Sequence, residues 1–124
     1  MKRTVILTIT IAFICAAWCM SGCAAKTTLY GQEIAEKNIT RIGDILANPA
    51  KSEGKTVKIK GKITEECPSG CWFMLKDDSG TMYVNIHPKN FVIPQASGRM
   101  AAVEGVVKKE GPKVSIIGSG VEIE

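Results

Sequence analysis

The sequence has few of the residues from which catalytic sites are usually built. Its 124 residues include one histidine, His87, and no nucleophile elbow, phosphate-binding loop or histidine–carboxylate constellation occurs in it. Glu65 and Glu66 are neighbours, so on a strand they point to opposite faces and cannot work together as general acid and base. Asp77 and Asp78 are typical of a turn. We therefore expect a protein that is not an enzyme and needs no cofactor.

Net positive charge is also scarce outside the N-terminal segment. The chain has 16 basic and 12 acidic residues. Removal of residues 1–22 would take away Lys2 and Arg3 and no acidic residue, which leaves the remainder nearly balanced. This balance does not favour nucleic acid as the partner.

Residues 1–22 have the features of a signal peptide. Lys2 and Arg3 precede an apolar stretch over 4–20 that is almost free of charge. The alternative is an uncleaved anchor, since this stretch is near the length of about 17–25 residues that spans a bilayer. Both possibilities place the rest of the chain outside the cytoplasm, at the cell membrane or the outer membrane.

The junction Gly22-Cys23 resembles the lipobox of bacterial-type lipoproteins, although Met20 stands where that motif usually has Leu. The resemblance implies cleavage before Cys23 and acylation of its sulfur and amino group. Membrane lipid is then the first predicted partner, because two or more acyl chains make a stable anchor.

The exported part divides into a tether and one domain. Residues 23–39 are polar and predict a flexible tether. The domain covers 40–124, and it begins with a predicted short helix over 40–48. Thr40 can cap this helix, and Pro49 ends it.

Alternating apolar residues dominate the domain and predict strands with one buried face. Val57, Ile59 and Ile63 share a face, and Gly61 between them allows a bend or bulge. The predicted strands cover 56–66, 71–76, 81–86, 99–109 and 113–124, the last interrupted at 118–120. In the connection over 87–97, we expect Phe91, Val92 and Ile93 to point inward.

Five strands in a small all-β domain avoid bare edges by closing into a barrel. The segments V-K-I-K-G-K-I, F-M-L-K-D-D-S-G-T-M-Y-V and G-R-M-A-A-V-E-G-V-V resemble small bacterial and archaeal OB-fold domains of the nucleic-acid-binding superfamily. The C-P-S-G-C-W-F segment resembles a subgroup of exported or lipoprotein OB domains. The resemblance implies a five-stranded OB-fold barrel preceded by a short helix.

Cys67 and Cys71 flank a Pro-Ser-Gly turn between the first two predicted strands. A disulfide would staple this loop, and its small ring predicts stabilisation at or below the low end of about 2–4 kcal/mol. Free or redox-active thiols are a further possibility. A thioredoxin-like role is not favoured, because the spacing is C-x3-C and no strand–helix unit follows.

A metal site is the other possibility for this loop. Pairing of Leu75 with Met82 places Cys71 near Ile86 and therefore near His87. Cys67, Cys71 and His87 would suit copper or zinc. Three ligands are one short of a closed structural site, however, and strand parity starts His87 and Cys71 on opposite faces.

The outward side of the second and third strands carries Trp72, Met74 and Tyr83. The OB-fold resemblance implies that this is the ligand face, where aromatic rings could stack on bases, sugars or a peptide. The alternative is that the tether or the helix covers it.

Lys58, Lys60 and Lys62 form an outward stripe on the first strand and complete the predicted ligand face. They could follow the phosphates of single-stranded nucleic acid or anionic lipid headgroups, or be a solvated surface. We expect a membrane-anchored, extracytoplasmic OB-fold lipoprotein that binds a protein or a small ligand; copper or zinc binding and nucleic-acid binding are the alternatives.

Overall fold

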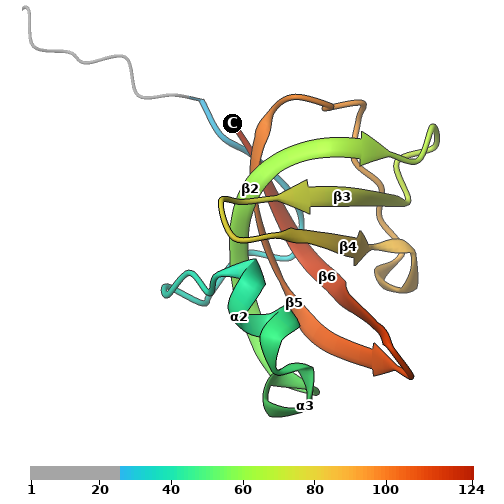
Figure 1. Ribbon diagram of the computed structural model, residues 1–124. Helices are drawn as coiled ribbons and strands as arrows, with labels where there is room; N and C mark the ends of the chain where they lie inside the picture. The colour runs from blue at the N-terminus through green and yellow to red at the C-terminus, as the bar shows by residue number, and fades with distance from the viewer. Residues whose placement is uncertain (1–25) are drawn as a thin grey trace, which may run out of the picture.

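A computed structural model describes residues 26–124 (Figure 1). The predicted signal peptide and Cys23 lie outside the described residues. Within 26–124, no helix has both the length and the apolar character needed to cross a bilayer.

Five strands form a closed barrel. They are β2 (Thr56–Glu66), β3 (Trp72–Lys76), β4 (Thr81–Asn85), β5 (Met100–Glu110) and β6 (Lys113–Ile123). All their pairings are antiparallel except β4 with β6, and β5 closes the barrel by pairing with both β2 and β6. This is the order of strands in an OB fold, so the predicted fold class is confirmed.

Alternation along β2, β3 and β4 determines which side chains fill the barrel. Leu75 pairs with Met82, as predicted, and both are fully buried. The interior also contains the predicted apolar residues of β2 and the neighbouring strands: Val57, Ile59, Ile63, Phe73, Val84 and Ile86. The inward and outward faces of these three strands are therefore those that the sequence indicated.

Gly61 lies where β2 changes partner from β5 to β3. A Cβ atom there would clash with the backbone carbonyl of Lys76, so glycine permits the close approach of β3. The shift of register in β2 comes later, between Ile63 and Glu65. The close approach at Gly61 and the bulge are thus separate features of the strand.

The structure differs from the sequence prediction at two places. β6 is one strand through 118–120, but its pairing is irregular there: Glu104 lies opposite Gly120 and Gly105 opposite Gly118, so Ser119 is the extra residue of a β-bulge in β6. In the connection after η2 (His87–Lys89), Ile93 is buried and Phe91 half-buried, but Val92 is 58% exposed. Three consecutive apolar residues in an extended segment cannot all face one way.

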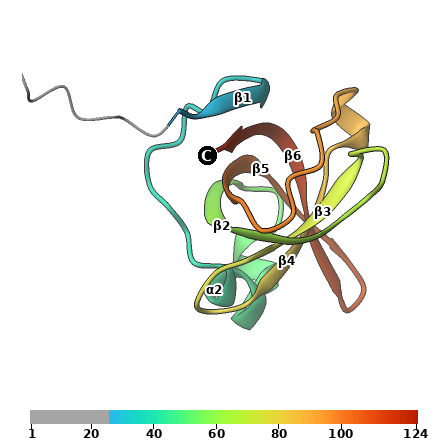
Figure 2. The same ribbon diagram turned by 90° about the horizontal axis from the view of Figure 1, so that it is seen from above.

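The predicted tether is ordered over most of its length. Its strand β1 (Thr28–Gly31) pairs antiparallel with the end of β6. Ile39 then forms a bridge to Lys58 on β2, and the Thr40 backbone N–H donates to the Lys58 carbonyl at 2.7 Å. Figure 2 shows this segment leaving β1 and passing along the outside of the barrel to α2. We call residues 28–40 the strap.

A buried carboxylate holds the middle of the strap. Glu104 on β5 is only 8% exposed, and its Oε1 accepts the backbone N–H groups of Ala35 and Glu36 at 3.1 and 2.7 Å. Gly120 lies beside Glu104 on β6, and a Cβ there would clash with the carbonyl of Gln32. Backbone hydrogen bonds to Glu104 therefore hold the polar strap on the barrel, and Tyr30 adds an apolar contact with the core.

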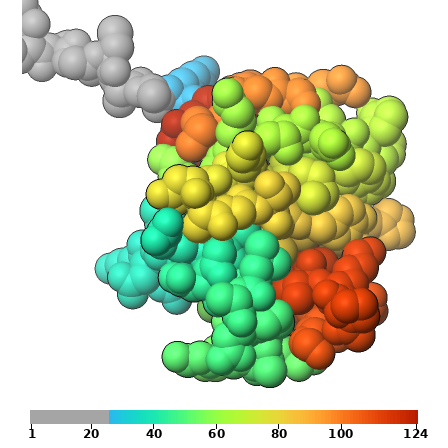
Figure 3. All heavy atoms as spheres, viewed as in Figure 1, coloured from blue at the N-terminus to red at the C-terminus, as the bar shows by residue number. Residues whose placement is uncertain are grey.

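The helical segment, α2 (Ile42–Ala47) and α3 (Pro49–Ser52), packs against the barrel, and the buried side chains of Ile42 and Ile45 belong to its core. Figure 3 shows this segment in direct contact with the β3–β4 hairpin. The predicted cap by Thr40 was wrong, because Arg41 is the N-cap residue and makes no side-chain cap.

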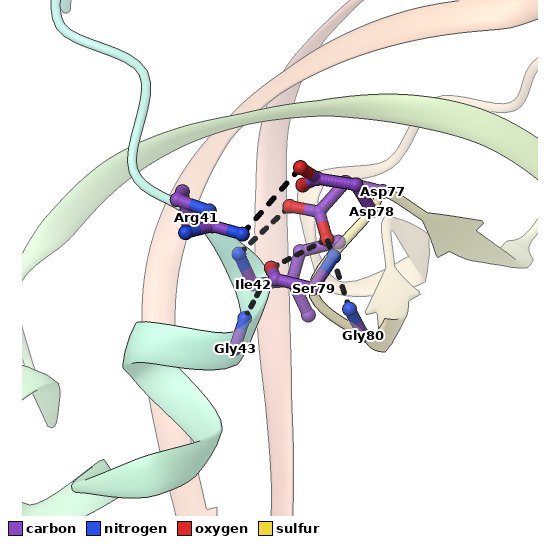
Figure 4. Close-up of polar contacts among 7 residues, drawn as sticks. All are labelled: Arg41, Ile42, Gly43, Asp77, Asp78, Ser79 and Gly80. Carbon is purple, nitrogen blue, oxygen red and sulfur yellow. Dashed lines mark hydrogen bonds and ion pairs between the residues drawn. The ribbon is translucent and has the colours of Figure 1, made fainter.

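The hairpin turn supplies the missing cap (Figure 4). Asp77 Oδ2 accepts the Ile42 N–H at 2.9 Å, and Ser79 Oγ accepts the Gly43 N–H at 2.8 Å. Asp77 Oδ1 also accepts the N–H groups of Ser79 and Gly80 within its own turn. One carboxylate therefore shapes the turn and begins the helix.

Candidate functional site

The loop from Cys67 to Cys71, here the cysteine loop, brings its two sulfurs to 2.7 Å. Both residues are half-buried. The Ser69 hydroxyl lies 3.0 Å from the Cys67 sulfur and 3.6 Å from the Cys71 sulfur. The described chain therefore holds two neighbouring thiols with a hydroxyl beside both, at the end of the barrel where β3 begins.

Backbone hydrogen bonds fix the shape of this loop. The Gly70 N–H donates to the Cys67 carbonyl at 2.8 Å, and the Cys67 N–H donates to the Trp72 carbonyl at 2.9 Å. Gly70 has a positive φ of 77°, and its own carbonyl accepts the Ile93 N–H at 3.1 Å. The loop is thus packed against the connection between β4 and β5.

Hydrogen bonding makes Cys67 acidic. The Cys71 thiol donates to the Cys67 sulfur and contributes most, and the Ser69 hydroxyl adds to it, which lowers the pKa of Cys67 from 9.0 to about 6. Such a thiol is largely thiolate at neutral pH, the form that reacts with disulfides and electrophiles.

His87 does not join the two cysteines. Although Cys71 lies beside Ile86 as predicted, with the Ile86 N–H donating to the Cys71 carbonyl at 3.1 Å, the chain turns into η2 at His87 and the residue is exposed. Across residues 26–124, no three histidine, cysteine or acidic side chains cluster as metal ligands do. The ligand set Cys67, Cys71 and His87 is therefore not assembled.

Two predicted ligand-face residues form an aromatic pair. The ring centroids of Trp72 and Tyr83 are 5.6 Å apart, with a tilt of 33° between the planes. Met74 lies directly opposite Tyr83 on the neighbouring strand, and all three side chains are half-buried. Within the described part of the tether, the strap contacts β6, β5 and β2 and not this face.

Lys113 completes this surface, and the sequence analysis missed it. Its ammonium lies 4.9 Å from the centroid of the Tyr83 ring, a cation–π distance. Lys113 opens β6, and only the parallel pairing of β4 with β6, in which Tyr83 lies opposite Ser115, brings it close. We call Trp72, Met74, Tyr83 and Lys113 the aromatic patch.

The aromatic patch and the cysteine loop are electrostatically linked. Partial burial contributes most to raising the pKa of Tyr83, and the negative charge of Cys71 and then of Cys67 raises it further. Residues 26–124 form no pocket. A ligand would therefore contact an open surface, with the thiols at one margin.

The lysine stripe does not belong to the aromatic patch as a whole. Lys58 and Lys60 lie opposite Glu104 and Ala102 on β5, whereas only Lys62 also pairs with β3. Lys60 forms an ion pair with Glu124 at 2.7 Å. Of the three lysines, Lys62 alone is therefore on the part of β2 that pairs with β3, the strand of Trp72 and Met74.

Comparison with known proteins gives the fold. No family model and no curated protein matches the chain. Among solved structures, the chain is similar to the hypothetical protein ygiW from E. coli, with 22% identity over 71% of this chain and 91% of that one and a TM-score of 0.56. The chain has an OB fold. An identity this low supports the architecture alone, so function has to be argued from the surface.

Proposed function

We propose that this protein is a lipid-anchored, extracytoplasmic OB-fold module that binds a protein or small ligand through the aromatic patch and performs no catalysis. The single observation that carries the proposal is the half-exposed Trp72–Tyr83 pair with Lys113 over the Tyr83 ring. Paired aromatic rings beside a cation give a rigid surface with apolar and polar contacts, which is typical of binding sites.

The position of the strap supports use of this particular face. The strap occupies the outer side of β6, β5 and β2, which leaves the β3–β4 side for a partner. If Cys23 is acylated, only residues 24–27 separate the lipid from β1, so the barrel would be held within about 18 Å of its anchor at an extension of about 3.5 Å per residue. A close anchor limits which sides of the barrel can face away from the membrane.

Site-specific crosslinking tests the binding face. A photoreactive benzoylphenylalanine in place of Tyr83 should yield a covalent product in intact cells. The same group in place of Val106, which is exposed on β5, is the matched control. Adding Trp72→Ala should reduce the product at position 83. Equal products at both positions, or none at position 83, would contradict the proposed face.

Lipid attachment is tested separately. Radiolabelled palmitate should be incorporated into the wild-type chain and not into the Cys23→Ala variant. An unlabelled wild-type chain would refute the lipoprotein assignment and leave the binding face untouched.

Single-stranded nucleic acid is the remaining candidate for stacking on Trp72 and Tyr83. Its basic track would have to be built without Lys58 and Lys60, which pair with β5. A fluorescent oligonucleotide should then bind weakly and with little salt dependence; tight binding that falls steeply with salt would favour nucleic acid instead.

A further inference from the structure

The cysteine loop holds its shape without a bond between its sulfurs. Three backbone hydrogen bonds connect the loop to its surroundings, namely Cys67 to Trp72, Gly70 to Ile93 and Cys71 to Ile86, and a fourth closes the turn from Gly70 to Cys67. A disulfide that closes a five-residue ring adds about 2 kcal/mol or less. Formation or loss of that bond therefore leaves the surrounding barrel in place.

The two sulfurs are close to each other and reachable from solvent. They are 2.7 Å apart, and both residues are half-buried and not enclosed. A structural disulfide is usually shielded, whereas exposed pairs are the ones that exchange. The arrangement is also asymmetric, because the Ser69 hydroxyl lies closer to Cys67 than to Cys71.

We propose that Cys67 and Cys71 form a reversible thiol–disulfide exchange site, in which Cys67 reacts with an external disulfide and Cys71 resolves the product. The Cys67 thiolate attacks one sulfur of a partner disulfide, forms a mixed disulfide and releases the first partner thiolate. The Cys71 thiolate, 2.7 Å away, then attacks Cys67 and releases the second. Two electrons pass to the partner disulfide, and two protons pass from the cysteines through water to the partner thiolates.

The acidity of Cys67 agrees with these roles. Its pKa of about 6, set by hydrogen bonds from Cys71 and then Ser69, provides thiolate for attack at neutral pH. The same low pKa makes Cys67 a good leaving group in the reverse direction, when an external thiol reduces the pair. The exchange site goes beyond ligand binding and does not depend on the aromatic patch.

Equilibration with glutathione tests the exchange. The full chain, kept in detergent, is incubated with reduced and oxidised glutathione at graded ratios, quenched with acid and alkylated. The tryptic peptide 63–76 reports Cys67 and Cys71 alone. We expect the pair to interconvert fully from either direction while the circular dichroism of the barrel stays unchanged. A pair that remains in one state until the barrel unfolds would overturn the proposal, as would stoichiometric zinc or copper protecting both thiols from alkylation.

Trapping of the mixed disulfide tests which of the two cysteines reacts first with the external disulfide. With oxidised glutathione, Cys71→Ser should accumulate a glutathione adduct on Cys67, because the serine hydroxyl can still donate to the Cys67 sulfur while the resolving thiol is gone. Cys67→Ser is the matched control and should form its adduct on Cys71 at least about threefold more slowly, since the favoured thiolate is missing. Equal rates, or no adduct in either folded variant, would overturn the assignment of Cys67 as the reacting sulfur.

Discussion

The β3–β4 hairpin has two ends that are built in opposite ways. At the turn end, side chains do the holding: Asp77 and Ser79 accept the N–H groups that begin α2 (Figure 4). At the other end, most of the hydrogen bonds are between backbone groups, at Cys67 and Gly70, and one side chain, Gln95, donates to the Pro68 carbonyl at 3.4 Å.

The contrast shows where the chain can carry chemistry. Asp77 is held by four donors, and although partial burial raises its pKa, the hydrogen bonds from Ile42, Ser79 and Gly80 outweigh burial and lower the pKa below 3.8. At the cysteine loop the thiols and the Ser69 hydroxyl bond to one another, and the only backbone groups that add to the Cys67 sulfur are those of Ser69 and Cys71 in the same loop. They remain available to react because the fold does not depend on them.

The largest expected effect comes from disturbing the backbone at the cysteine-loop end. Gly70→Ala would place a Cβ against the carbonyl of Ile93 at a positive φ of 77°. Strain of about 1–2 kcal/mol adds to this clash, so we expect a loss of about 3–4 kcal/mol of unfolding free energy in urea.

Gly98→Ala is the matched control for this change. Gly98 also has a positive φ, of 86°, but no atom lies within 4 Å of its added Cβ. It should lose only the strain, about 1–2 kcal/mol. Equal losses at the two glycines would mean that contact with Ile93 does not hold the loop.

The second-largest expected effect comes from a substitution at the turn end of the β3–β4 hairpin. Asp77→Ala removes the cap of α2 and the acceptor of the turn, so we expect a loss of about 2–3 kcal/mol in urea denaturation. Asp78→Ala removes only an exposed ion pair with Arg41 at 3.4 Å and should cost about 0.5 kcal/mol or less.

The pH dependence of Asp77→Ala has a definite sign. Because the folded pKa of Asp77 is lowered, its stabilisation is fully present above the ordinary carboxyl value and is lost as the pH falls through the folded value. The difference between wild type and variant should therefore be constant near neutral pH and shrink below about pH 4. A difference that grows in acid would contradict the role of the carboxylate.

The local alternation of apolar residues predicted the strands of the barrel. It could not predict contacts between segments that are far apart in the sequence. Alternation gave β2 its bounds and placed Leu75 opposite Met82. Nothing local marks the strap, because its attachment depends on Glu104, 68 or 69 residues away. A lone acidic residue within the apolar run of β5 was the available signal.

In the candidate site, too, the sequence predicted the positions that depend on local alternation and missed those that depend on contacts between distant strands. Trp72, Met74 and Tyr83 lie outward as their parity indicated, since parity is a local property. Lys113 was missed because it depends on a parallel pairing between distant strands. His87 was placed wrongly because the strand ends before it and the chain turns into η2.

The smallest expected change in stability compares the two serines. Ser69→Ala removes a hydroxyl that contacts only the thiols, so unfolding free energy should change by less than about 0.5 kcal/mol. Ser79→Ala removes the acceptor of the Gly43 N–H and should cost about 1 kcal/mol.

The reactivity of Cys67 should respond in the opposite order: Ser69→Ala should change it and Ser79→Ala should not. In the reduced wild type, the rate of Cys67 alkylation, followed in peptide 63–76, should rise with pH around a midpoint of about 6, because only the thiolate reacts. Ser69→Ala loses one of the hydrogen bonds that stabilise this thiolate, so its midpoint should move upward towards 9.0. Ser79→Ala should keep the wild-type midpoint. If both serines shifted the midpoint equally, the acidity of Cys67 would come from general stability of the hairpin and not from its own loop.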